Sequence, residues 1–332
     1  MDTPIKATVI IPVKNGGTLF CRVLDTVMSQ VTPWPFDCLV LDSGSSDGSL
    51  EYAQNKPGVT VQIIPPGEFG HGKTRNVGVG IARGEFIAMI THDALPASPN
   101  WLKNLVNAME MAPDVAGAFG SHLAYPDARP STKTELKTHF AGFGASQTLF
   151  RLEDPERYAR EEGHRQFLHF FSDNNACLRK SVWEKHPYPD VDFAEDQLWA
   201  KTIIEAGYAK VYAPEAAVYH SHDFGIFETG QRAYDESRAF HRLFAYTIVP
   251  SLLHAARAWL YLCRRNILWT RQTPISRQEK LGYILEIPFL AAAKMIGAYL
   301  GEREAHLPTW LVRKASRDKA LQAAASQNNP PK

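Results

Sequence analysis

The chain has 332 residues, of which 45% are hydrophobic, and its formal net charge is +1. This length predicts one domain of about 230 residues with an appended segment, and the apolar share predicts a sizeable buried core. The near-zero charge argues against a nucleic-acid partner, because contacts to phosphates require a clear excess of basic residues. The four cysteines are too scattered for a metal site or a disulfide framework, which favours a reducing cytosol.

Short β-branched runs alternate with helical periodicity in the first third of the chain, which is typical of βαβ units and a parallel sheet. The predicted strands are 7–13, 36–41, 59–64 and 86–91. Helices are expected over 19–28, after Ser46 and Asp47, and over 73–82. An open sheet of this kind binds its ligands beyond the carboxyl ends of its strands.

The rest of the chain divides into three parts. Residues 125–165 lose periodicity and predict an insertion or lid. Order returns with a strand-like segment at 170–178, a helix over 195–205 and two strands at 209–212 and 216–222. Long helices follow residue 227 up to about residue 301, and the polar end predicts disorder. The predicted division is 1–228, a helical extension at 229–312, and a disordered tail at 313–332.

Asp93 follows the apolar run 86–91, so a predicted strand delivers one carboxylate to the ligand-binding edge of the sheet. A carboxylate in this place can hold Mg²⁺ or Mn²⁺ against a diphosphate, because these cations prefer oxygen ligands. The alternative is an aspartate that caps the following helix. We therefore expect an enzyme that acts on a nucleotide-activated substrate.

Several motifs occur in the order Ile10–Asn15, Val40–Gly48, Lys73–Gly78, Asp93, Phe193–Leu198 and Val218–His222. Together they resemble the family 2 glycosyltransferases, over roughly residues 5–240. The resemblance implies an α/β GT-A fold, which is a Rossmann-like, mostly parallel sheet flanked by helices, here with an α-helical C-terminal extension. Residues 1–228 would then form the catalytic domain that binds the nucleotide sugar and the acceptor.

Three segments carry a finer resemblance, to bacterial rhamnosyltransferases of surface-polysaccharide assembly: Glu68–Asn76, Thr91–Pro96 and Ser172–Ala176. It implies dTDP-L-rhamnose as donor and a growing glycan or lipid-linked saccharide as acceptor. Alternatives are a transferase that uses a UDP-sugar, a nucleotidyltransferase, and a non-catalytic scaffold. A nucleotidyltransferase ordinarily needs a longer glycine-rich basic loop after the first strand than Lys14-Asn15-Gly16-Gly17 offers.

The residues expected to bind the nucleotide sugar are Pro12, Lys14, Asn15, Asp42, Lys73, Arg75, His92 and Asp93. Asp42 would accept the imide N–H of a pyrimidine, in a pocket framed by the end of the first strand; otherwise it is a turn former. The forked guanidinium of Arg75 suits diphosphate oxygens better than an ammonium does. The alternative for Arg75 is a solvated arginine on a helix face.

Asp196 is the expected catalytic base, since inverting transfer needs a carboxylate to accept the proton of the acceptor hydroxyl. Glu195 would orient the sugar or the acceptor; alternatively, both residues complement the helix dipole. His220 and His222 lie two residues apart and share one face of a strand, and one of them, by preference His220, would complete the metal shell. The family commonly has a second acid two positions before Asp93, where this chain has Thr91.

Acceptor contacts are expected from Asn174 and Asn175. Arg232 and Arg238, in the early C-terminal segment, are expected to reach the acceptor or the diphosphate.

The C-terminal segment is basic and aromatic, with nine Arg or Lys against three Asp or Glu between residues 230 and 280. Such a helix suits peripheral contact with the inner face of the cytoplasmic membrane. The alternative is a helical hairpin packed on the catalytic domain or in a homo-oligomer. The apolar stretch 282–300 is interrupted by Glu286, Pro288 and Lys294, and no signal sequence opens the chain, so we expect a cytoplasmic protein that does not span the membrane.

Overall fold

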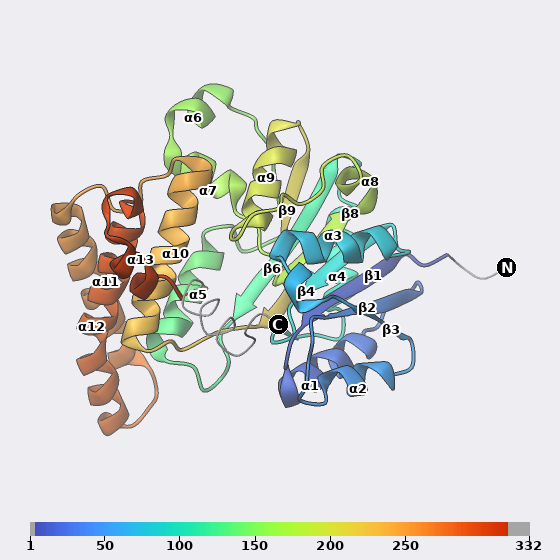
Figure 1. The fold of residues 1–332 in the computed structure, drawn as a ribbon, viewed down its shortest axis with the longest axis horizontal. Helices are drawn as coiled ribbons and strands as arrows, with labels where there is room; N and C mark the ends of the chain where they lie inside the picture. Colours follow the sequence, from blue (N-terminus) through green and yellow to red (C-terminus); the bar gives the residue numbers. More distant parts are fainter. Residues whose placement is uncertain (1–3, 318–332) are drawn as a thin grey trace. The chain divides into compact units, whose positions relative to one another are not determined.

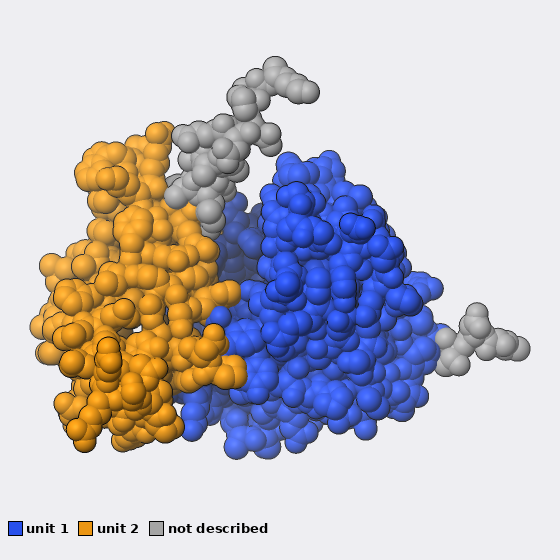
Figure 2. Space-filling view, turned by 90° about the horizontal axis from the view of Figure 1, so that it is seen from below, with its two compact units in different colours: residues 1–125, 136–221 blue, residues 126–135, 222–332 orange. Residues whose placement is uncertain are grey.

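The computed structural model describes residues 4–317 of the chain. Its contacts divide the protein into two compact units, which are coloured separately in Figure 2. The first unit comprises residues 1–125 and 136–221, and the second comprises residues 126–135 and 222–332. Helix α5 (Pro130–Ala141) begins in the second unit and ends in the first.

One sheet of nine strands forms the centre of the first unit (Figure 1). The strands are β1 (Ala7–Val13), β2 (Phe36–Asp42), β3 (Val59–Ile63), β4 (Phe86–Ile90), β5 (Leu95–Pro96), β6 (Val115–Leu123), β7 (Thr148–Phe150), β8 (Asn175–Arg179) and β9 (Ala209–Tyr219). Their order is β3-β2-β1-β4-β8-β6-β9-β5, and β7 pairs with β9. Because β1, β2, β3, β4, β6 and β9 run in one direction, the sheet is mostly parallel, as predicted.

The strand register brings the segments that carry the predicted site residues to one edge of this sheet. Val13 pairs with Asp42 at the end of β1 and β2, and β4 runs parallel to them. Strand β8 is antiparallel to β4 and pairs its first residue, Asn175, with Ile90. Strands β6 and β9 end on the same side, where Leu123 pairs with Tyr219. We call this the binding edge: the ends of β1, β2, β4, β6 and β9 together with the start of β8.

Two hydrophobic clusters cover the two faces of the sheet, because neighbouring residues of a strand point to opposite sides. In β1, Val9 and Ile11 belong to the first cluster and Ile10 to the second. The first cluster includes side chains of α1 (Gly17–Met28), α2 (Ser49–Gln54) and α4 (Trp101–Met109). The second includes side chains of α3 (His71–Ile81), α7 (Glu162–His169), α8 (Lys180–Trp183) and α9 (Glu195–Glu205).

The structure differs from the sequence-based elements in three places. Strand β6 and helix α4 lie in residues 97–124, for which we predicted no element, and β6 is rich in Ala and Gly, which favour strands weakly. The two strands predicted around Pro214 are one strand, β9, whose register shifts beside Gly120 and His122. The predicted lid contains α5, β7, α6 (Pro155–Arg160) and the start of α7.

The second unit is helical, as expected for the C-terminal segment. It contains α10 (Ile226–Phe244), α11 (Leu252–Gln272), α12 (Arg277–Gly301) and α13 (Thr309–Ala315). Helix α12 packs tightly on α10, since a Cβ on Gly297 would lie 2.0 Å from the Gly230 carbonyl oxygen. Of the predicted disordered tail, 313–315 belong to α13, and its part from residue 318 onward lies outside the described residues.

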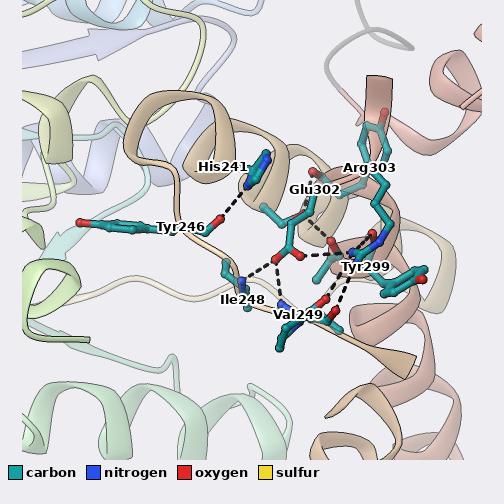
Figure 3. A network of polar contacts seen from close by, with 11 residues as sticks. His241, Tyr246, Ile248, Val249, Tyr299, Glu302 and Arg303 are labelled. Atoms are coloured by element: carbon teal, nitrogen blue, oxygen red, sulfur yellow. Dashed lines mark hydrogen bonds and ion pairs between the residues drawn. The ribbon is translucent and has the colours of Figure 1, made fainter. Parts of the chain in front are cut away.

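A polar network fixes the linker between α10 and α11 to the end of α12 (Figure 3). The Glu302 carboxylate accepts hydrogen bonds from the backbone N–H groups of Ile248 and Val249. Arg303 donates to the carbonyl oxygens of Tyr299 (2.9 Å) and Pro250 (3.1 Å). The start of α11 is therefore held in place by the end of α12.

Among residues 4–317, one helix, α12, is long and apolar enough to cross a membrane, and 22% of its most apolar window is buried within the protein. Length and composition alone do not distinguish such a helix from a packed one.

Candidate active site

Asp42 ends β2 at the binding edge and is completely buried. Its Oδ1 atom accepts hydrogen bonds from the N–H groups of Gly44 (2.9 Å) and Ser45 (3.0 Å), so the turn-forming alternative describes this oxygen. Its Oδ2 atom is buried without a hydrogen-bond donor among residues 4–317. One carboxylate oxygen thus builds the turn, and the other is an acceptor that still lacks a donor.

Asn15 joins the loops that follow β1 and β2. Its Oδ1 atom accepts from the Ser46 N–H (2.8 Å), and its own N–H donates to Ser45 Oγ (2.9 Å). Its backbone has a φ of 52°, a left-handed conformation that asparagine tolerates better than most residues. Asn15 therefore holds the loops after β1 and β2 together at the binding edge, in addition to any contact with a ligand.

The other residues predicted around the nucleotide are more exposed. Lys14 and Lys73 are exposed, whereas Pro12 and His92 are half-buried. The His92 ring lies beside Gly16, where a Cβ would approach His92 Cδ2 to 3.2 Å. The polar groups of the two lysines are thus accessible to an anionic ligand.

Arg75 has protein partners that differ from the predicted diphosphate. Its side chain on α3 is only 7% exposed. The guanidinium lies 2.8 Å from Glu195 Oε1 and 3.2 Å from Asp173 Oδ2, and it donates to the His71 carbonyl oxygen. It is therefore not the solvated arginine of our alternative either. In this structure Arg75 neutralises carboxylates that lie directly beside the expected base.

Asp196 occupies the first turn of α9 and is half-buried. Its Oδ2 atom accepts a hydrogen bond from the Asp173 N–H (3.2 Å), which ties it to the segment just before β8. Burial, with the charges of Glu195 and Asp173, raises the pKa of Asp196 well above its usual range. A carboxylate with a raised pKa is a stronger base, which suits proton abstraction from a hydroxyl.

Asp173 shares this environment. Its carboxylate accepts a hydrogen bond from the Tyr188 hydroxyl (2.7 Å), and its side chain is 2% exposed. Burial raises the pKa of Asp173 to about 6, although Arg75 opposes this shift. Three carboxylates, those of Asp173, Glu195 and Asp196, thus lie in one place together with the guanidinium of Arg75. The sequence alone does not indicate a role for Asp173, although it stands directly before Asn174.

The residue that precedes Glu195 is strained. Ala194 has a φ of 58° and a ψ of 33°, in the left-handed region. A non-glycine residue pays roughly 1 kcal/mol or more for this conformation, which is typically retained at functional sites. The strained backbone of Ala194 fixes how the chain enters α9, whose first two residues are Glu195 and Asp196.

A second group of polar side chains lies at the ends of β4, β6 and β9. Asp93 Oδ1 is 3.6 Å from His220 Nε2. The ring of His122, on β6, packs edge-on against that of His220 with centroids 5.3 Å apart. Burial, and to a lesser extent His220, lowers the pKa of His122 well below its usual value, which favours the neutral form of its ring. The sequence alone does not indicate His122, because the strand that carries it has no clear strand pattern.

The predicted acceptor residues fall into different environments. Asn174 is half-buried just before β8. Asn175 is completely buried, and its amide contacts Trp101, Ser121 and Ala216. All hydrogen-bonding groups of this amide are thus engaged inside the protein, which contradicts a direct contact between Asn175 and the acceptor.

The remaining predicted residues belong to the second unit. His222 is exposed and follows His220 by two residues. Arg232 is exposed and stacks on the Phe224 ring, at 4.7 Å from its centroid. Arg238 approaches Glu304 (3.4 Å).

Residues 8–185, more than half of the chain, match the model of glycosyl transferase family 2. The chain belongs to this family. This family 2 glycosyltransferase is 33% identical over 242 residues to the O-antigen chain rhamnosyltransferase RfbN of Salmonella typhimurium, covering 71% of this chain and 73% of RfbN. It is 29% identical over 238 residues to the O-antigen chain rhamnosyltransferase WbaN of Salmonella anatum, covering 70% and 71% of the two chains.

Solved structures share the fold of this glycosyltransferase. A mannosyltransferase from Pyrobaculum calidifontis, in complex with GDP-Man and Mn²⁺, aligns with a TM-score of 0.58 at 18% identity, covering 92% of this chain and 89% of that one. TarS of S. aureus, in complex with UDP-GlcNAc, aligns with a TM-score of 0.51 at 15% identity, covering 91% and 92%. The predicted GT-A glycosyltransferase fold is thus confirmed.

Proposed function

We propose that this glycosyltransferase transfers L-rhamnose from dTDP-L-rhamnose to a hydroxyl of a growing bacterial polysaccharide or lipid-linked saccharide, with inversion at the anomeric carbon. The names of RfbN and WbaN support the sugar and the class of acceptor. The three motifs around Lys73, Asp93 and Asn174 support the same assignment. Assembly of this kind would take place in the cytoplasm, at the inner face of the membrane.

The observation that carries the proposal is the position of Asp196. It is half-buried, bonded to the segment that precedes β8, and backed by buried charges. In the proposed reaction, Asp196 accepts the proton of the acceptor hydroxyl while the oxygen attacks the anomeric carbon. The new C–O bond forms opposite the bond to the diphosphate, which breaks and leaves dTDP. Asp196 is then a general base, and Arg75 holds its surroundings rather than the diphosphate.

The nucleoside would lie at the ends of β1 and β2. Asp42 Oδ2 is the acceptor proposed for the pyrimidine imide N–H, since it is buried and lacks a donor among the described residues. Lys14 and Lys73 are exposed cations that would attract the diphosphate. Asn174 and Arg232 are proposed to contact the acceptor.

Asp93 and His220 are proposed to hold a divalent cation, Mg²⁺ or Mn²⁺. The fit rests on their donors, since a carboxylate oxygen and an imidazole nitrogen 3.6 Å apart can bind one ion. His222 is a candidate third ligand because it follows His220 by two residues. When bound, the cation would neutralise the charge that develops on the departing diphosphate. The hydroxyl of Thr91, buried without a hydrogen-bond partner among residues 4–317, stands where the family commonly has a second carboxylate.

The donor is tested by calorimetric titration of the enzyme with dTDP-L-rhamnose, UDP-sugars and GDP-mannose, with Mn²⁺ and with a chelator. We expect selective binding of dTDP-L-rhamnose that weakens on chelation. Selective binding of a UDP-sugar would contradict the donor assignment. Release of pyrophosphate from a nucleoside triphosphate and a sugar phosphate would identify a nucleotidyltransferase. The anomeric configuration of the product, read by NMR, tests inversion.

A further inference from the structure

Helix α11 exposes a stripe in which leucines and arginines alternate. The stripe consists of Leu253, Arg257, Leu260, Arg264, Leu268 and Arg271. Their spacing of three or four residues places them on one face of the helix. The three leucines expose 61%, 60% and 45% of their surface, although leucines are ordinarily buried. We call this face the Leu–Arg stripe.

The arginines of the stripe lack an acidic partner in the part of the chain that the structure describes. Arg257, Arg264 and Arg271 are exposed, and none of them forms an ion pair within residues 4–317. Helix α11 contains no Asp or Glu at all. Three cations therefore lie beside three apolar side chains on a helix that carries no acidic side chain.

The opposite face of α11 packs against α12. Trp259 Nε1 donates a hydrogen bond to the Pro288 carbonyl oxygen (2.9 Å), and Cys263 packs with Ile287 and Ala291. Trp259 therefore faces the neighbouring helix rather than the exposed stripe. Because the network of Glu302 and Arg303 holds the start of α11 (Figure 3), the stripe is a preformed face.

Helix α12 adds a second exposed apolar row. Leu281, Leu285, Phe289 and Ile296 recur at four- or seven-residue spacing and expose 60%, 62%, 62% and 60% of their surface. Contiguous exposed apolar surface of this kind ordinarily marks an interaction site.

We propose that the Leu–Arg stripe binds the surface of a bilayer that contains anionic lipids, with α11 lying in the headgroup region. Apolar side chains enter the boundary with the acyl chains, and guanidinium groups pair with phosphate headgroups. This inference rests on the proposed function for its biological meaning, because a lipid-linked acceptor is carried by such a surface. Binding itself needs neither donor nor acceptor.

The charge pattern favours a lipid surface over a second copy of the chain. A two-fold contact through α11 would bring the arginines of one copy against those of the other, which is repulsive. A spanning arrangement is disfavoured by α12, which packs on α10 at Gly297 and Gly301 and whose Lys294 pairs with Glu135. Contact from one side leaves this packing intact.

The test is sedimentation of the full-length protein with vesicles of phosphatidylcholine alone or of an equimolar mixture with phosphatidylglycerol. We expect binding to the mixed vesicles that weakens as salt is added. The triple variant Arg257→Gln, Arg264→Gln and Arg271→Gln should bind roughly 100-fold more weakly, since each basic residue near an anionic surface contributes about fivefold. Leu260→Ser with Leu268→Ser should also weaken binding.

A matched control removes three exposed cations from the first unit: Arg22→Gln, Lys103→Gln and Lys185→Gln. It should bind like the wild type. Thermal unfolding verifies that each variant folds. Equal binding by the two triple variants, equal binding to both kinds of vesicle, or no binding together with an α11-dependent dimer in solution would each overturn the proposal. If carbonate does not extract the protein from membranes, the protein is inserted in the bilayer and the proposed surface contact is wrong. A wrong donor assignment leaves all these readings unchanged.

Discussion

Replacement of Arg75 by methionine should destabilise the first unit by about 3–5 kcal/mol. The guanidinium is nearly inaccessible and lies within 2.8 and 3.2 Å of two carboxylates, and removal of one partner of a buried pair leaves the other charges uncompensated. Arg75→Lys should cost less, because an ammonium keeps the charge but lacks the fork. Urea denaturation measures both effects. As a control, Arg83→Met removes an exposed ion pair with Asp37 and should cost less than about 1 kcal/mol.

The loss of unfolding free energy in Arg75→Met should become smaller as the pH falls. Burial raises the pKa of Asp173 to about 6 although Arg75 opposes it, so removal of Arg75 raises this pKa further. A carboxyl whose pKa is raised in the folded state stabilises the protein when protonated, and that contribution is lost as the pH rises through the folded pKa. The deficit of Arg75→Met should therefore shrink between about pH 8 and about pH 5.

Two results would refute this reasoning. If Arg75→Met has normal stability but no affinity for the donor, Arg75 binds the diphosphate, as the sequence predicted. A loss of stability that is the same at both pH values would mean that the neighbouring carboxyls are not what Arg75 compensates.

Further predictions concern catalysis and the second unit. Asp196→Asn should abolish transfer, while its affinity for the donor, measured by calorimetry, persists. If this variant is active, Asp196 is not the catalytic base. In the wild type, the rate should rise with pH above the ordinary carboxyl range, near 3.9, because burial raises the pKa of Asp196 and its charged form is the base. Asp93→Ala should weaken donor binding with Mn²⁺ but not with a chelator, and an equal effect in both would exclude the metal role. Glu302→Ala should destabilise the second unit by roughly 1–3 kcal/mol, since it leaves two backbone N–H groups without acceptors; unfolding that matches the wild type would contradict this.

The sequence predicted the alternating part of the fold well, because β1, β2 and β4 are largely apolar segments with a polar residue at or just after the end: Lys14, Asp42 and Thr91. It predicted the extent of α9, and it located Asp93 and His220, which the structure brings together. In each case a local sequence pattern was enough for the prediction, because the residues next to a strand end or a helix start indicate where the element begins or ends.

What the sequence did not reveal depends on contacts between distant segments. Arg75 and Glu195 are 120 positions apart, and nothing near Arg75 indicates that its partners are carboxylates of the protein itself. His122 was missed because β6 has a single β-branched residue, Val115, and is otherwise rich in Ala and Gly, which favour strands weakly. Asn175 resembles its neighbour Asn174 in sequence, and only the pairing of β8 shows that one side chain is committed to the interior.

The burial of Asn175 restricts which residues of the proposed acceptor segment could change. The amide links three strands and Trp101, and a Cβ on Gly120 would lie 2.3 Å from its nitrogen and 1.9 Å from the Ala216 oxygen. Neither position has room to vary without displacing the sheet. If Asn174 contacts the acceptor as proposed, new specificity is expected to arise at Ser172 and Asn174, the half-buried neighbours of this fixed point.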